Sequence, residues 1–358
     1  MSFKFTDDSI TIRDYMFPRM ETYNKNSLKN LYNYLNEVNL KNVTIISYDE
    51  QKINRVKINS TFVSTKLQTY IETKLNKKSV CKIIINNLTI TINIYYRTEN
   101  ISFLLYMLIK YIRFISSMIE NISLNKLEIN YYLTNYKKLV NKNIILSKDQ
   151  VNSGSCLIDN NGSAWINIWR KEEIFKVTLH ELIHAFGFSN YEDTSELINH
   201  FNSKYNSKSK IINSNEAYTE IWANILNCYL ISQTTRKTPL NFFITMLSLE
   251  RSYSIFLAQK ILHKIKGKND IDINKETNVL SYYIIRAEIY ENLSKFIEYC
   301  SIKNKNYIKI TNSTGIIKYI LNNNKIKQNN RRFNRNQEEL IYKTLRMSLN
   351  EINPFMRE

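Results

Sequence analysis

Apolar and polar positions along the chain predict a sheet with a helix packed on it. Residues 81–96 are rich in β-branched and aromatic side chains around a central Asn-Asn turn, and residues 126–134 have the same character. Between them, residues 101–119 are apolar enough for a buried helix. Lys110 and Arg113 fall inside this window, and cations at the centre of a bilayer argue against a membrane span. Strand, helix and strand in this order indicate a sheet covered by a helix on one face.

The residues before this sheet carry weaker patterns. A helical pattern covers residues 28–38, and short alternating stretches at 43–48 and 56–63 are typical of strands. We interpret residues 1–78 as an N-terminal region of unknown role.

A second strand and helix follow a loop at residues 152–162. Residues 163–169 alternate large apolar side chains with small or polar ones, as a half-exposed strand does. Glu172 and Glu173 then open a helix, because acidic side chains are favourable at a helix N-terminus, and Gly187 ends it.

The rest of the chain is mostly helical. Residues 216–231, a run that starts at Pro239, and residues 279–299 all have helical patterns. The sequence therefore predicts an α+β fold with a mixed sheet above and a mostly helical lower half. We expect the main domain at residues 79–305, followed by a basic C-terminal extension at residues 306–358.

The composition is that of a folded, basic protein. With 358 residues, 43% of them hydrophobic, the chain can bury a core, which excludes disordered and fibrous classes. Its 50 Lys and Arg against 32 Asp and Glu leave a net charge of +18. Residues 301–346 hold 11 basic and 2 acidic residues, so half of the excess lies there. Within this stretch, residues 322–336 are poor in apolar side chains and predict a basic arm.

Cysteine spacing and the N-terminus bear on the compartment. The 4 cysteines lie far apart without CxxC spacing, so neither a zinc ribbon nor a disulfide scaffold is indicated. The first residues include acidic side chains and lack the apolar stretch of a secretory signal. We therefore expect an intracellular, reducing compartment. The wealth of Asn, Lys, Ile and Tyr is typical of AT-rich genomes, such as those of large DNA viruses and parasites.

Two of the 4 histidines lie in one H-E-x-x-H motif, His180-Glu181-Leu182-Ile183-His184. Residues i and i+4 of a helix lie on the same face, so two imidazoles can converge on one metal ion. Glu181 lies further round the helix and can reach a water on that ion without being a ligand. Leu182 and Ile183 account for the buried face of the helix without either histidine.

A catalytic zinc site needs a third protein ligand. Glu216 and Glu220, in the sequence N-E-A-Y-T-E, again stand at i and i+4 on a separate helix. One carboxylate can ligate the metal while the other accepts the remaining ring N–H of a ligand histidine.

Together the two motifs resemble the gluzincin branch of the zinc metallopeptidases, the group of thermolysin and neprilysin. This resemblance implies Glu216 as the third ligand and Glu220 as the carboxylate behind a ligand histidine. It also implies that the strand before the motif helix, here residues 165–169, is the edge strand that pairs with an extended peptide. The likeness covers two short motifs and that strand. The gap of 32 residues from His184 to Glu216 is longer than in thermolysin-like enzymes, and Glu220 stands where Asp is more common.

Other third ligands have to be weighed. The metzincin pattern H-E-x-x-H-x-x-G-x-x-H has Gly187 in register here, but Asn190 replaces the last histidine. The sequence after the motif also resembles leishmanolysin, in which the third histidine comes after an insertion, and His200 or His263 would then be needed. Both are more simply explained as surface residues, His200 on a helix and His263 among lysines.

The expected mechanism is hydrolytic. Zinc held by two neutral imidazoles and one carboxylate lowers the pKa of its water to about 7 and polarises a carbonyl. Glu181 then acts as general base and afterwards as general acid. Family enzymes commonly stabilise the oxyanion with a Tyr, His or Arg from a downstream helix; the candidates here are Tyr282, Tyr283 and Arg286, of which Tyr283 and Arg286 are preferred. Cys156 is more simply a small buried thiol than a latent metal ligand.

The leading hypothesis is a zinc-dependent metallopeptidase with about one zinc ion per chain. Its substrate is a protein or peptide, which the basic surface can select for acidic character. Endopeptidase and carboxypeptidase action stay open, since Arg286 can bind a terminal carboxylate. The alternative is a nucleic-acid-binding or packaging protein with a vestigial or structural zinc site, whose basic arm at residues 322–336 contacts phosphates. A nucleic-acid-binding module is not evident, and Phe333 alone is a poor stacking platform.

Overall fold

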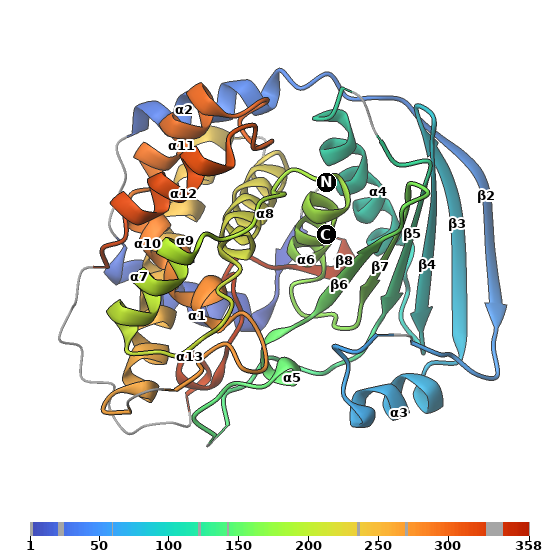
Figure 1. The fold of residues 1–358 in the computed structure, drawn as a ribbon. Coiled ribbons are helices and arrows are strands. Elements are labelled where there is room, and N and C mark those ends of the chain that lie inside the picture. Colours follow the sequence, from blue (N-terminus) through green and yellow to red (C-terminus); the bar gives the residue numbers. More distant parts are fainter. Residues whose placement is uncertain are drawn as a thin grey trace.

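A six-stranded mixed sheet, with helices stacked against one of its faces, forms the body of the protein (Figure 1). The computed structural model describes residues 3–20, 25–58, 60–120, 123–141, 143–234, 237–268, 271–326 and 339–357. This architecture confirms the predicted α+β class.

The sheet has the strand order β2-β3-β4-β5-β7-β6. In chain order its strands are β2 (Val43–Lys52), β3 (Lys77–Ile85), β4 (Leu88–Tyr96), β5 (Lys126–Tyr132), β6 (Gly154–Ile158) and β7 (Ser163–Ile168). Strands β4, β5 and β7 are parallel to one another, whereas β2, β3 and β6 each run antiparallel to their neighbours. Isoleucines at alternate positions of β3 and β4 point to one face, where they are fully buried.

The helices of the first layer are α4 (Ser102–Ser117) and α6 (Ile174–Ala185), which lie against the buried face of the sheet (Figure 1). Next to α6 lies α8 (Ser214–Ser232), which in turn packs on α9 (Pro239–Ile265). A smaller apolar cluster on the opposite face joins α3 (Thr65–Lys74) to Tyr132 and Trp169.

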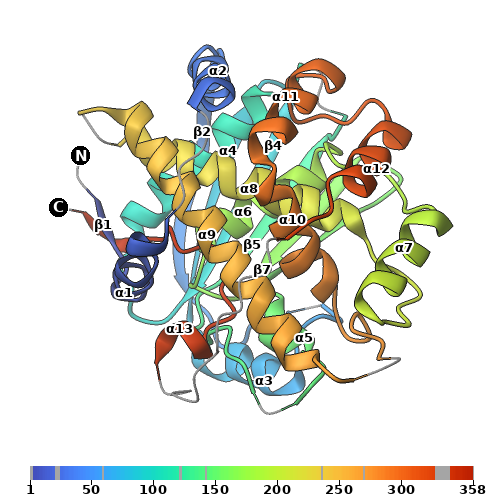
Figure 2. The same cartoon turned by 90° about the vertical axis from the view of Figure 1, so that its left-hand side faces the viewer.

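The remaining helices surround these layers. They are α1 (Asp7–Met16), η1 (Phe17–Arg19), α2 (Lys25–Asn36), α5 (Lys148–Val151), α7 (Ser195–Tyr205), η2 (Leu280–Ile285), α10 (Arg286–Glu291), α11 (Leu293–Lys303), α12 (Ser313–Asn322) and α13 (Leu340–Lys343). Near the two termini, β1 (Phe3–Phe5) and β8 (Ile352–Arg357) pair in a separate two-stranded sheet, so both ends of the chain lie close together (Figure 2).

Several predicted elements are confirmed. The strand pattern at residues 81–96 forms the hairpin β3–β4, with Asn86 in the left-handed region at φ 54°. The apolar window 101–119 forms α4, and its polar residue Arg113 donates to the Lys41 carbonyl oxygen over 2.6 Å. Among the described residues, no helix is both long and apolar enough to cross a membrane.

Four sequence-based interpretations are corrected. The strand at residues 163–169 forms, as β7, but it lies between β5 and β6, so it is not the edge strand. The edge is β6, which falls inside the segment 152–162 interpreted as a loop. Residues 56–63 form no strand among their described positions, because Val56, Ile58 and Val63 pack into the α3 cluster instead.

The fourth correction concerns residues 279–299, interpreted as one helix. A π-helical turn, η2, opens this run, and Asn292 interrupts it between α10 and α11. The change of period alters which side chains face the rest of the protein, and this affects the candidate site below.

Contacts cross both predicted domain boundaries. Strand β2, before residue 79, pairs along its whole length with β3. After residue 306, every residue from 344 to 352 is buried; we call this segment the C-terminal strap. The boundaries themselves stay predictions, but the structure places the flanking segments in the same core.

Charged side chains bind the C-terminal strap to the interior. The Glu173 carboxylate accepts backbone N–H groups of Met347 at 3.0 Å and Ser348 at 2.6 Å, and it pairs with the Lys138 ammonium at 2.9 Å. Arg346 pairs with Glu351 at 2.9 Å within the strap. Because burying a charge is costly unless it is paired, these contacts allow a polar segment to cross the core.

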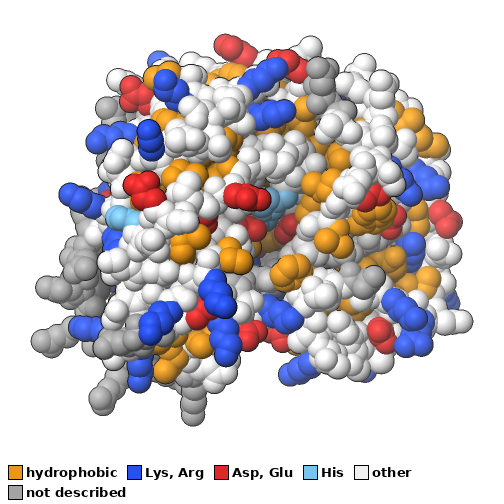
Figure 3. Space-filling model, viewed as in Figure 1, with side chains coloured by type: hydrophobic (Ala, Val, Ile, Leu, Met, Phe, Trp, Pro, Cys, Tyr) orange, Lys and Arg blue, Asp and Glu red, His pale blue; other side chains and the backbone are white. Residues whose placement is uncertain are grey.

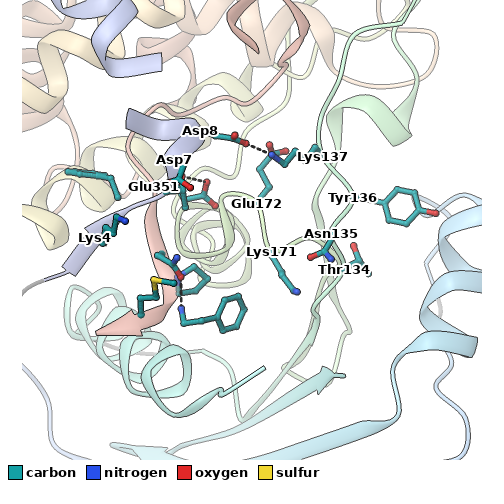
Figure 4. Close-up of a pocket in the computed structure, with 16 residues that line it drawn as sticks. Lys4, Asp7, Asp8, Thr134, Asn135, Tyr136, Lys137, Lys171, Glu172 and Glu351 are labelled. Atoms are coloured by element: carbon teal, nitrogen blue, oxygen red, sulfur yellow. Dashed lines mark hydrogen bonds and ion pairs between the residues drawn. The ribbon is translucent and has the colours of Figure 1, made fainter. Parts of the chain in front are cut away.

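A cavity of about 390 Å³ lies where the chain ends meet this network (Figure 4). Glu172 lines it and accepts the Lys138 backbone N–H at 2.7 Å. Burial raises the pKa of Glu172 to about 7, with further raising by Glu173 and Glu351, although Arg346 opposes this.

This raised pKa predicts how stability depends on pH. Between the usual value of 4.5 and about 7, the folded state holds the Glu172 proton more tightly than the unfolded state, so stability falls as pH rises through that window. We expect Glu172→Gln to stabilise the protein at pH 8 by about 1–3 kcal/mol, with little effect at pH 4. Urea unfolding at both pH values measures this. Glu298→Gln, at an exposed position, is the control; an equal pH dependence in Glu172→Gln and wild type contradicts the prediction.

Candidate metal centre

Helix α6 places the two motif histidines on one face. Its opposite side packs through apolar residues such as Leu182 and Ile183, both fully buried. The helix ends at Ala185, and Gly187 follows two residues later with a φ of 64°, which is easily reached without a side chain. The Gly187 and Phe188 N–H groups donate to the carbonyl oxygens of His184 and Ile183 at 2.9 and 3.1 Å, which satisfies the last turn.

Helix α8 brings the second motif to the same place. It begins after Asn213, and the Asp193 carboxylate accepts the Ser214 N–H at 3.1 Å. Its first turn carries Glu216, whose Oε2 lies 3.2 Å from His180 Nε2 and 3.3 Å from His184 Nε2.

Glu220 fixes the ring of His180 from behind. Its Oε2 lies 2.9 Å from His180 Nδ1, which leaves Nε2 directed towards Glu216. The other oxygen of Glu220 accepts from Lys176 at 2.7 Å and from Arg286 at 3.3 Å. Although burial alone would raise the pKa of Glu220, these cations and His180 hold it well below its usual range. The carboxylate is therefore ionised and accepts the imidazole N–H.

Three side chains offer ligand atoms to one ion. One atom each from His180, His184 and Glu216 lies within 4.8 Å of the other two, and among the described residues this is the group that meets the criteria for a metal site. Two imidazoles and a carboxylate are a donor set that fits zinc. The helix spacing, the convergent Nε2 atoms and the carboxylate behind His180 all agree with such an ion.

The charges at this place also suit a cation. Burial would lower the pKa of His180, but hydrogen bonds to Glu216 and Glu220 raise it to about 10. For the Glu216 carboxyl, burial acts in the opposite direction and would raise the pKa. The charges and hydrogen bonds of the two histidines nevertheless hold this pKa well below its usual range. Glu216 and Glu220 thus favour positive charge here, from bound protons or from a metal ion.

Glu181, on α6, directs its carboxylate towards the edge strand β6. The residue is 6% exposed, and burial raises its pKa. The carboxylate rests against the first residue of β6: a Cβ atom added to Gly154 would lie 2.4 Å from Glu181 Oε1. A residue with a side chain at position 154 would therefore displace the Glu181 carboxylate.

The group opens into a cleft of about 500 Å³. The wall on one side is β6, and the facing wall includes residues 274–278. Figure 3 shows histidine side chains at the bottom of a hollow near the centre of this face, with acidic side chains beside them. Ile158, Phe62 and Ile211 line the cleft with large exposed apolar surface.

The structure corrects the choice of Tyr283. Its hydroxyl is fully buried and donates to the Leu345 carbonyl oxygen at 2.8 Å, away from the cleft. The neighbouring Tyr282 lines the cleft instead and donates to Glu216 Oε2 at 3.0 Å. The π-helical turn η2 carries both tyrosines, and the orientation of this turn decides which one reaches the cleft.

Arg286 also lies outside the cleft. It is fully buried and donates to Glu220 and to the Met347 carbonyl oxygen. It is therefore out of reach of a substrate carboxylate or an oxyanion, and its position near Glu220 makes it a positioning residue.

The rival ligands lie elsewhere. His200, on α7, has its Nε2 2.7 Å from the Asn324 amide, and His263 is exposed near the end of α9. Asn190 lines the cleft outside the ligand group. Cys156, on β6, faces the cleft as a thiol, because burial and the Glu181 charge raise its pKa. Most of the basic arm lies outside the described residues, since residues 327–338 are not described.

Sequence reasoning missed three features of the site. The sequence does not indicate that Lys176 pairs with Glu220, because a lysine inside an amphipathic helix normally points to solvent. Gly154 carried a signal, since glycine is rare in this chain, with 5 in all, and glycine in a strand often marks a close approach. Tyr282 could not be separated from Tyr283 without the helix geometry.

Comparisons with protein-family models, with curated proteins and with solved structures find no match for this chain.

The ligand group predicts metal binding by named side chains. We expect the purified chain to bind about one zinc ion, and Glu216→Ala to weaken binding about 100-fold or more, because it removes one of three ligands. His200→Ala is the matched control. Metal content after dialysis and competition with a chelating dye measure the affinity. Equal affinities for Glu216→Ala and wild type would exclude this ligand set.

Proposed function

We propose that the chain is a zinc-dependent metallopeptidase. One observation carries the proposal: two histidines of H-E-x-x-H and Glu216 from a second helix converge beside Glu181, at the bottom of a cleft bounded by a sheet edge. Zinc in such a set supplies a Lewis acid that acidifies a water and polarises a peptide carbonyl.

The edge strand β6 supports a peptide as the substrate. The Trp169 N–H donates to the Ser153 carbonyl oxygen, and the Asp159 N–H donates to that of Ser163. Hydrogen-bonded pairs alternate in an antiparallel ladder, so residues 154, 156 and 158 direct their N–H and C=O groups away from β7. An extended peptide can pair with these groups in the cleft.

Glu181 is positioned to transfer protons. Its carboxylate lies between β6 and the ligand histidines, on the wall that a bound peptide would cover. Burial raises its pKa, which makes it a stronger base once it is ionised. In this proposal it takes a proton from the attacking water and delivers it to the leaving amine.

Tyr282 is the candidate for stabilising the oxyanion. Its hydroxyl lies in the cleft within 3.0 Å of Glu216 Oε2, so it can turn from that carboxylate to a substrate oxygen close to the metal. The cleft wall carries Lys275 next to Glu276, and these opposite charges give no preference for acidic residues. The apolar lining supports peptides with apolar side chains near the scissile bond.

Replacing the proposed base tests the proposal directly. We expect Glu181→Gln to retain zinc and to lower peptide hydrolysis by about 10²–10⁴-fold, because an amide cannot take the water proton. Glu276→Gln, an exposed change in the same cleft, should retain both. Cleavage of an unfolded protein substrate, read by mass spectrometry beside metal content, measures this. Full activity in Glu181→Gln, or no cleavage by the zinc-loaded wild type, would refute the proposal.

The adjacent tyrosines allow a matched test of the oxyanion donor. Tyr282→Phe should lower kcat by about 10²–10³-fold with zinc retained, because one hydrogen bond to the developing charge is lost. Tyr283→Phe should instead lower stability by about 1–3 kcal/mol, because the Leu345 carbonyl oxygen loses its donor, and should leave kcat nearly unchanged. A large loss of kcat in Tyr283→Phe, with kcat unchanged in Tyr282→Phe, would identify Tyr283 as the oxyanion donor.

A further inference from the structure

The sheet has a second edge, far from the cleft, at strand β2. Nine of the ten residues of β2 are exposed. Three of them are large and apolar: Ile45, Ile46 and Tyr48 have 60%, 53% and 49% of their surface exposed. In Figure 1, β2 is the outermost strand, at the right-hand end of the sheet, and no labelled helix lies beyond it. A long apolar strand with a free edge is a ready site for pairing with another strand.

A bulge in β2 groups its apolar side chains. Ile45 stands opposite Ile83 and Tyr48 stands opposite Cys81, both of which belong to the buried face of the sheet. Directly opposite residues share a face, so Ile45 and Tyr48 lie on that face although they are three residues apart. The register shift between Ile45 and Ser47 makes this possible. The helices do not cover this end of the sheet, so the side chains of Ile45 and Tyr48 form an exposed apolar patch.

The backbone of β2 offers hydrogen-bonding groups along the same edge. The Ile53 N–H donates to the Asn76 carbonyl oxygen at 2.9 Å, which fixes the alternation of the ladder with β3. Residues 48, 50 and 52 therefore direct their N–H and C=O groups away from β3. They can take up a further antiparallel strand without any change in the monomer.

We propose that β2 pairs with β2 of a second copy of this chain around a twofold axis. Antiparallel pairing with the axis between Ile46 and Ser47 places Ile45 of each copy opposite Tyr48 of the other. In this register, opposite residues of the two copies lie on the same face of the joined sheet. This is possible because the bulge shifts the alternation of side chains by one residue at the same place in both strands. Pairs of an aromatic and a β-branched side chain stabilise a sheet, and this one occurs twice.

The strand itself favours a second copy as the occupant. In this register Thr44 stands opposite Asp49, and Val43 stands opposite Glu50, so no like charges oppose each other over residues 43–50; at the end of the strand, Lys52 stands opposite Lys41, which lies before β2. A twofold axis closes the assembly, since neither copy keeps a free β2 edge. The two clefts lie at the other ends of the joined sheet, next to β6, and both stay open.

Molecular mass in solution tests the proposal independently of catalysis. Sedimentation equilibrium of the full chain at micromolar concentrations is expected to give twice the mass of one chain. Ile45→Lys should halve this mass, because it places a charge in the apolar patch of Ile45 and Tyr48 at the contact between the two copies. Glu50→Pro should do the same by removing an outward N–H group.

Ile302→Lys is the matched control, because Ile302 is 68% exposed on α11, away from β2. It should keep the mass of the wild type. Circular dichroism and thermal melting show that each variant is folded, and two different β2 variants guard against the failure of one. A monomeric wild type, or dimers in both folded β2 variants, overturns the proposal. A monomeric wild type would mean that the β2 edge is available to a strand of another protein.

Discussion

The buried carboxylate of Glu220 is the group on which the candidate metal centre depends. It holds the ring of His180 through Nδ1, so that Nε2 faces Glu216. A lone carboxylate at this depth would take up a proton and become a poorer acceptor. Lys176 and Arg286 prevent this, since both pair with its other oxygen. The geometry of the site thus depends on two buried cations that never reach the cleft.

One of these cations, Arg286, also connects the site to the end of the chain. Arg286 donates to the Met347 carbonyl oxygen, and Glu173 receives N–H groups from the C-terminal strap on one oxygen and the Lys138 ammonium on the other. Removing one partner of such a network leaves an uncompensated buried charge, at a cost of about 3–5 kcal/mol. The C-terminal strap is therefore part of the core on which α6 and α8 rest.

The sheet places its two free edges in different surroundings. At one end, β6 is short and borders the cleft, where Glu181 rests against Gly154. At the other end, β2 is long and exposed. Its apolar residues Ile45 and Tyr48 lie on the face that the helices cover elsewhere, but beyond the reach of those helices. Both edges have unpaired backbone groups, but among the described residues the candidate metal ligands and Glu181 lie beside β6. We therefore propose a peptide as the occupant of the β6 edge and a partner strand as the occupant of the β2 edge.

The sequence by itself determined the type of the elements with a strong period and the spacing of the motif residues. The helix at residues 101–119 and the spacing of His180 and His184 depend on periods within one segment, and these can be read without knowing the fold. Strand order depends on pairing between distant segments, so only the tertiary structure showed that β6 is the edge. It also decided between Tyr282 and Tyr283, because neighbouring residues on a helical turn point about 100° apart and packing sets the direction of the turn.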